Sequence, residues 1–306
     1  MHTHPDYCQR LPLEVCGDIL HGFKPLLSSS VRMAVEGSST GRGRTPTWLA
    51  AASDVRLSGY SHEGTDTLLE LQLPPLGEAA ADIYAQEEFW PTKPPPETTA
   101  IDVLAETVGE VAIGNAESLR YDHSLLDRLA RLGKVLSDRL ESISLIQTAR
   151  SVVPLNRAVV ENARELIHRT PPPQQVRVVG KLDMIRHSTR SFALELEDGS
   201  EVHGVLEDHQ GVESLSQWFG RPVLVLGKAV YRPSGSLLRV DALAVESGEG
   251  QPTLFSNVPP PRSAKAAAPR TAPGGQAWKA FSSYFGKWPG GESGEEWAAI
   301  MQDLRQ

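Results

Sequence analysis

The sequence predicts an α+β N-terminal domain, then a small five-stranded β-barrel of the OB type, then a flexible tail that ends in short helices. Three observations support this fold class. Apolar residues recur at spacings of three and four in the first half of the chain. They alternate with polar residues in the second half. A segment rich in proline, alanine, glycine and serine then precedes an aromatic-rich C-terminus.

The composition is that of a globular protein rather than a wholly disordered one. The chain has 306 residues, of which 40% are hydrophobic and 22% are charged. This length suits about two domains with connecting segments. The net charge of −8 argues against a surface devoted to nucleic acid and against attachment to anionic membranes.

Cysteine content and hydropathy indicate a cytoplasmic protein. The two cysteines, Cys8 and Cys16, are too few for a disulfide scaffold, so we expect a reducing compartment. The opening residues lack the basic and apolar segments of a signal peptide. No run of about 18 apolar residues is present to cross a bilayer, so no membrane contact is expected.

The N-terminal domain is predicted to span residues 11–170, after a disordered N-terminus at residues 1–10. Its first element is an amphipathic helix in which Pro25 marks either the start or a kink. A hairpin follows, because two strand-like runs are separated by turn-forming residues. The remaining elements, in order, are a helical stretch over 100–140, a strand over 142–146 and a helix over 156–168.

The second domain, at residues 175–246, is predicted to be the OB-like barrel. Residues 191–197 alternate apolar with polar side chains, and Asp198-Gly199 favours a tight hairpin. Three strands, a short helix over 211–219 and two further strands follow the element order of an OB-fold. A small SH3-like barrel is the main competitor, and the inserted helix argues against it. The strands are expected at 175–184, 191–197, 201–206, 221–231 and 236–245.

After a predicted disordered linker over 247–276, residues 277–306 are interpreted as a tail that docks onto a protein partner. Six of the chain's 19 aromatic residues fall between Trp278 and Trp297. Aromatic anchors of this kind dominate interface energetics. The alternative is that the tail folds back onto the chain's own domains. The expected contact residues are Trp278, Phe281, Phe285, Trp288, Trp297, Ile300 and Leu304.

One segment of the tail carries a family resemblance. Gly286-Lys287-Trp288-Pro289-Gly290-Gly291-Glu292, followed by Glu295-Glu296 and a short apolar helix, resembles the terminal tails of bacterial toxin-neutralising, antitoxin-like proteins. The resemblance covers about 20 residues, and Gly291 stands where those tails carry an acid. It implies a folded body whose flexible tail neutralises a toxin, such as a nuclease of the PIN class.

The barrel offers an alternative function, because OB-folds often bind single-stranded nucleic acid across their second and third strands. Over residues 175–246, however, ten carboxylates face eight Lys and Arg residues, which favours a structural or protein-binding barrel. The residues that would contact phosphate are Arg177, Lys181, Arg186, Arg190, Lys228 and Arg232.

Signals for catalysis or metal binding are weak throughout the sequence. It contains no phosphate loop, dinucleotide fingerprint, HExxH or GxSxG motif. His2, His4, Cys8 and Cys16 match no closed zinc pattern. We therefore expect a non-catalytic regulatory protein without metal or cofactor. A hydrolase in the N-terminal domain is the remaining class.

Overall fold

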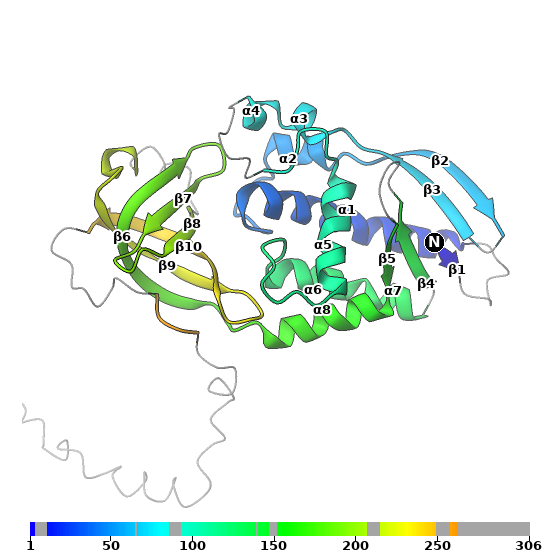
Figure 1. The fold of residues 1–306 in the computed structure, drawn as a ribbon. Helices are drawn as coiled ribbons and strands as arrows, with labels where there is room; N and C mark the ends of the chain where they lie inside the picture. Colours follow the sequence, from blue (N-terminus) through cyan, green and yellow to red (C-terminus); the bar gives the residue numbers. More distant parts are fainter. Residues whose placement is uncertain are drawn as a thin grey trace, which may run out of the picture. The chain divides into compact units, whose positions relative to one another are not determined.

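The computed structural model describes residues 1–3, 11–64, 66–85, 93–138, 140–146, 152–206, 215–248 and 258–261. Met1–Arg262 form one compact unit. In it a domain of helices and one sheet is followed by a closed five-stranded barrel (Figure 1). The predicted fold class is therefore confirmed for the described residues.

The first helix, α1 (Leu13–Glu36), carries the predicted apolar face. Ile19 and Phe23 are among its buried residues. The helix runs through Pro25 rather than starting there. It ends at Gly37, which has a φ of 74° and donates its N–H to the carbonyl four residues earlier. Glycine is favoured at this position because the left-handed conformation strains other residues.

The helical stretch predicted over residues 100–140 is in fact three helices. Gly114 adopts a φ of 64° and interrupts the stretch. Asp122 then caps the next helix by accepting the N–H of Leu125. The three helices are α5 (Ala100–Ala112), α6 (His123–Arg131) and α7 (Gly133–Asp138). The shorter α2 (Thr47–Ala52), α3 (Leu76–Ala79) and α4 (Ala81–Tyr84) precede them, and α8 (Arg157–Arg169) follows them.

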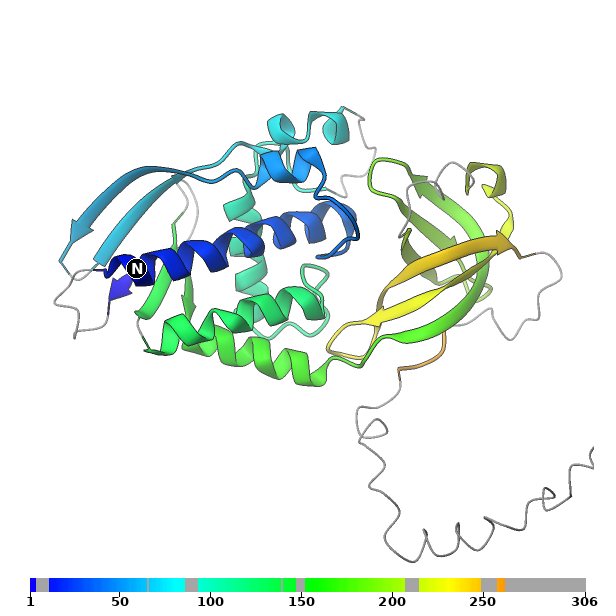
Figure 2. The same ribbon diagram turned by 180° about the vertical axis from the view of Figure 1, so that it is seen from behind.

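A five-stranded sheet with the strand order β2-β3-β1-β4-β5 completes this domain. Its strands are β1 (His2–Thr3), β2 (Arg56–Glu63), β3 (Asp66–Gln72), β4 (Leu140–Leu145) and β5 (Val153–Asn156). β1 is antiparallel to both β3 and β4. The sequence predicts disorder for residues 1–10, but His2 and Thr3 form a strand, and residues 4–10 lie outside the described ranges. Viewed from both sides, the β2–β3 hairpin lies beside α1 at the end of the domain that carries the N-terminus (Figures 1 and 2).

The barrel closes in the order β10-β8-β7-β6-β9, with β9 and β10 paired. β8 and β10 are parallel, whereas the other neighbours are antiparallel. This topology agrees with an OB-like fold. The predicted helix over 211–219 is represented by a 3-10 turn, η2 (Ser216–Trp218), and residues 207–214 lie outside the described ranges. The strands are β6 (Gln174–Arg186), β7 (Ser191–Glu195), β8 (Glu201–Leu206), β9 (Pro222–Tyr231) and β10 (Leu237–Ser247).

The barrel has its own apolar interior. Phe192 is 1% exposed and packs among residues that include Val178, Leu194 and Val225. Gly204 lies on the neighbouring strand, and a Cβ at that position would collide with the Phe192 ring. A residue without a side chain is therefore needed beside this ring.

Candidate functional site

The docking residues predicted in the tail lie outside the described ranges. These residues are Trp278, Phe281, Phe285, Trp288, Trp297, Ile300 and Leu304. The tail interpretation therefore stays a prediction, and a site must be sought within the compact unit.

The six basic residues of the nucleic-acid hypothesis do not gather on one exposed face. Arg177 and Lys181 are exposed on β6, and Lys181 Nζ lies 3.2 Å from the Glu195 carboxylate. Arg186 and Lys228 are half-buried. The other two of the six, Arg190 and Arg232, contact the N-terminal domain instead, as detailed below.

The outer face of β7 and β8, where OB-folds commonly bind ligand, is acidic. Its exposed residues are Glu195, Glu201 and His203. The aromatic residue on these strands, Phe192, points into the barrel core. Stacking on exposed aromatic rings and contacts to phosphate are the usual sources of affinity for single strands. The described part of this face offers His203 but no exposed Phe, Tyr, Trp, Lys or Arg.

The loop between β6 and β7 contacts α1 through Arg190. Arg190 is 6% exposed and has a φ of 56°, an uncommon conformation for a residue with a side chain. Its Nη2 lies 3.6 Å from Oε2 of Glu36. Glu36 in turn accepts a hydrogen bond from Arg32 at 2.6 Å. The conformation of Arg190 thus serves a contact between the barrel and the helices.

The β9–β10 loop makes a second contact with the N-terminal domain. The N–H of Ser234 donates to the Ala116 carbonyl at 3.3 Å. The Ser236 hydroxyl donates to Glu117 at 2.8 Å, and Arg232 Nη1 lies 3.5 Å from the same carboxylate. Both loops that border the usual OB ligand face, β6–β7 and β9–β10, therefore contact the N-terminal domain.

A buried ion pair lies at the centre of this junction. Arg239 Nη2 lies 3.1 Å from Oδ2 of Asp122, and both side chains are at least nine-tenths buried. Asp122 also accepts hydrogen bonds from Ser39 and from the Leu125 N–H. Arg239 Nε donates to Asp241 at 2.6 Å. Burial alone would raise the pKa of Asp122, but Arg239 and these donors outweigh it and hold the pKa below its ordinary value.

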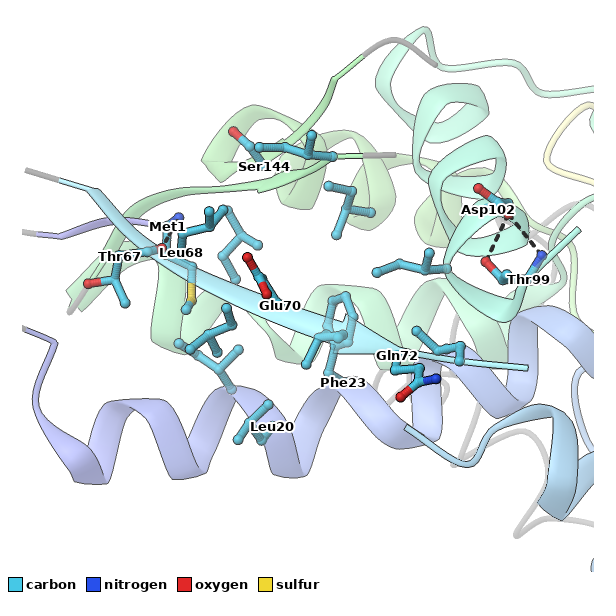
Figure 3. Close-up of a pocket in the computed structure, with 18 residues that line it drawn as sticks. Met1, Leu20, Phe23, Thr67, Leu68, Glu70, Gln72, Thr99, Asp102 and Ser144 are labelled. Carbon is cyan, nitrogen blue, oxygen red and sulfur yellow. Dashed lines mark hydrogen bonds between the residues drawn. The ribbon is translucent and has the colours of Figure 1, made fainter. Parts of the chain in front are cut away.

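A cavity lies in the N-terminal domain, between β3 and β4 of its sheet. β1 is two residues long: His2 pairs with Asp66 on β3 and with Ser142 on β4, and Thr3 pairs with Leu140 on β4. Beyond β1 the strands border an open cavity of about 760 Å³ (Figure 3). We call this cavity the β3–β4 groove. Its lining residues come from β3, β4, α1 and the start of α5, with Met1 and Thr67 at one end and Thr99 and Asp102 at the other.

The β3 edge of the groove has unused backbone groups. Met1 N donates to the Thr67 carbonyl at 2.9 Å, and Thr67 N donates to the Met1 carbonyl at 3.0 Å. Because backbone polar groups of a strand point alternately to its two sides, the N–H and C=O groups of Leu69 and Leu71 also face the groove. In the described part of the chain, β3 pairs only with β1 and β2, so neither residue has a strand partner on this side.

The β4 edge is similar. Ser144 lies opposite Pro154 in the β4–β5 pair, and proline has no N–H to donate. The bonded pairs are therefore the residues on either side, and the backbone polar groups of Ser144 point away from β5, toward the groove. Ser144 is exposed and lines the cavity.

The inner wall of the groove is apolar. The apolar lining residues on the strand side are Leu69 and Leu71 of β3, Leu73 directly after β3, and Ile143 and Leu145 of β4. The helices contribute Ile19, Leu20, Phe23 and Ile101. The charged side chains among the described lining residues are both acidic, Glu70 and Asp102. Asp102 accepts hydrogen bonds from the N–H and hydroxyl of Thr99, which fixes it as a helix cap.

The groove was not predicted from the sequence. Its two strand edges are about 70 residues apart in the chain, and the two-residue strand β1 lies between them at one end only. A pattern of apolar alternation predicts a strand but not which neighbour the strand lacks. Leu69 and Leu71 alternate with Glu70 and Gln72, which was the available signal for a half-buried strand.

The described residues show neither a metal cluster nor a membrane span. Among them, no group of three or more His, Cys, Asp or Glu side chains could hold a metal ion. His4 and Cys8 lie outside these ranges. No helix in the described part of the chain is long and apolar enough to cross a bilayer.

Comparison of the sequence with protein families and curated proteins, and of the fold with solved structures, finds no match.

Proposed function

We propose that this chain is a non-catalytic binding protein that captures an extended segment of a protein partner as an added strand in the β3–β4 groove. One observation carries the proposal: two strand edges with unused backbone groups face one cavity above an apolar wall. An extended peptide satisfies such edges with main-chain hydrogen bonds, and alternate side chains fill the apolar wall.

The antitoxin-like hypothesis adds a second contact to this proposal. In it, Trp288 and Trp297 of the tail hold a toxin such as a PIN-type nuclease, while the groove binds an extended segment of the same partner. The resemblance of the tail and its aromatic content support this part. We place the function in the cytoplasm, because the chain carries only two cysteines.

Nucleic-acid binding by the barrel receives less support. The outer face of β7 and β8 carries Glu195 and Glu201, and two of the six proposed phosphate contacts, Arg190 and Arg232, are engaged with Glu36 and Glu117. An acidic face repels a phosphate backbone.

The variant Ser144→Pro tests strand addition directly. The ring of proline removes the N–H that faces the groove and occupies its place, while the β4–β5 ladder keeps its bonds. We expect a fluorescent seven-residue peptide of alternating valine and threonine to bind the wild-type chain. Binding to Ser144→Pro should be weaker by about ten-fold or more. Fluorescence anisotropy measures the affinity.

The matched control is His62→Pro. His62 lies opposite Thr67 in the β2–β3 pair. Because the Thr67 backbone groups bond to Met1, those of His62 face the solvent edge of β2, so proline there costs no ladder hydrogen bond. His62→Pro should bind the peptide like wild type. Equal binding to wild type and Ser144→Pro, or no binding to either, would refute strand addition. A small apolar ligand that competes equally in all three proteins would assign the groove to a different ligand class.

A further inference from the structure

The chemistry of the groove also specifies the kind of segment that fits it. Resting on the strand-addition function above, we infer that the partner segment alternates large apolar residues with polar ones and carries Lys or Arg at the polar position opposite Glu70. The side chains of β3 and β4 that flank the groove supply the argument, because each face of an added strand meets a different set of them.

The inner face sets the apolar positions. Leu69 and Leu71 are half-buried on β3, and Ile143 and Leu145 are buried on β4. All four line the groove. Side chains of an added strand that point the same way would pack between them, and burial of each large apolar side chain favours binding. Every second residue of the segment must therefore be apolar.

The outer face sets the charge. Glu70 lies on the opposite side of β3 from Leu69 and Leu71, and its side chain covers Gly59, its cross-strand neighbour on β2, where a Cβ would collide with it. No ion pair of Glu70 occurs among the described residues. A residue of the added strand opposite Glu70 would be its cross-strand partner on the groove side. Opposite charges are favoured in such pairs and like charges are not.

The residues around Glu70 also suit a long basic side chain. Leu68 lies two positions before Glu70 on β3, and Ile146 directly follows β4; they are 37% and 57% exposed. The methylene stem of Lys or Arg covers such apolar surface while its charged end stays in water. Because His2 pairs with Asp66 on β3 and with Ser142 on β4, Ile146 lies level with Glu70 and Ser144 lies level with Leu68.

Two peptides that differ at one residue test the inference. In the alternating valine and threonine peptide, the central threonine is replaced by lysine in one and by glutamate in the other. We expect the lysine peptide to bind the full chain about three- to ten-fold tighter than the glutamate peptide at low salt. The preference should shrink as salt is added, because the pair is exposed.

Charge reversal on the protein provides the matched test. Glu70→Lys should invert the preference between the two peptides. Glu63→Lys makes the same charge change on the same hairpin, at a residue that does not line the groove, and should leave the preference unchanged. Thermal unfolding of both variants checks that they fold. If Glu70→Lys fails to fold, the salt dependence of the lysine and glutamate peptides on the wild-type chain decides instead.

The outcomes separate this inference from the function on which it rests. If the neutral peptide binds and Ser144→Pro blocks it, but the charged peptides bind equally, strand addition stands and the charge rule is overturned. If no peptide binds, strand addition itself is overturned. A dimer of the unliganded chain in sedimentation velocity that Ser144→Pro dissociates would assign the groove to a second copy and overturn both.

Discussion

Asp122 and Arg239 form a buried ion pair between the N-terminal domain and the barrel. Asp122 belongs to the cap of α6, and Arg239 belongs to β10, so each is buried against an element of the other domain. A buried ion pair adds little stability relative to an apolar pair of the same size. Removal of one member is costly, because the other charge is then buried without a partner.

We therefore expect Arg239→Ala to lower the free energy of unfolding by about 3–5 kcal/mol. Asp122 would keep its Ser39 donors but lose its countercharge. Arg177→Ala, at an exposed arginine on β6, is the control and should change stability by about 0.5 kcal/mol or less. Urea unfolding measures both. Equally small effects of both variants would mean that the Asp122–Arg239 ion pair does not contribute to the stability of the chain.

The lowered pKa of Asp122 predicts a pH dependence with a definite sign. The unfolded chain binds a proton at Asp122 at a higher pH than the folded chain does, so stability rises with pH across this window. The stabilisation is complete above the ordinary pKa, near 3.8, and is lost as pH falls through the folded value. Asp122→Asn should flatten the unfolding free energy below about pH 4 relative to wild type. Unchanged acid sensitivity in this variant would place the effect on other carboxylates.

At the scale of elements, the sequence predicts long periodic segments well and short ones poorly. The alternation of Phe192 and Leu194 with polar residues predicts β7, because such a pattern spans several residues. β1 and β5 were missed since strands of two and four residues carry too little pattern. The groove was missed for the same reason, because it is the part of the gap between β3 and β4 that the two-residue strand β1 does not fill. The Asp122–Arg239 pair lies more than 100 residues apart in sequence, and no local pattern encodes it.

At the scale of the whole molecule, the barrel and the helices share a core. Val230 and Leu238, from β9 and β10, pack with the buried apolar residues of the N-terminal domain. The barrel interior is a separate cluster. A shared apolar contact and a buried ion pair couple the two parts more strongly than an exposed linker would.

The described part of Met1–Arg262 should accordingly unfold as one unit. In native-state hydrogen exchange with increasing urea, the amides of Val108 in α5 and Val225 in β9 should approach the same opening free energy. In Arg239→Ala the two values should separate, because the coupling is weakened. Distinct values in the wild-type chain would show that the barrel opens on its own.

The orientation of β1 gives the groove a direction as well as a composition. Since β1 is antiparallel to β3 and to β4, those two strands run the same way. A segment that enters in the favoured antiparallel sense is then antiparallel to both walls at once, and it runs from N- to C-terminus toward the Met1 end. A segment with the reversed sequence could place each side chain opposite the same groove residue only by pairing parallel to both β3 and β4. Recognition in this groove would therefore depend on chain polarity, so two partner segments with identical side chains but opposite direction are different ligands.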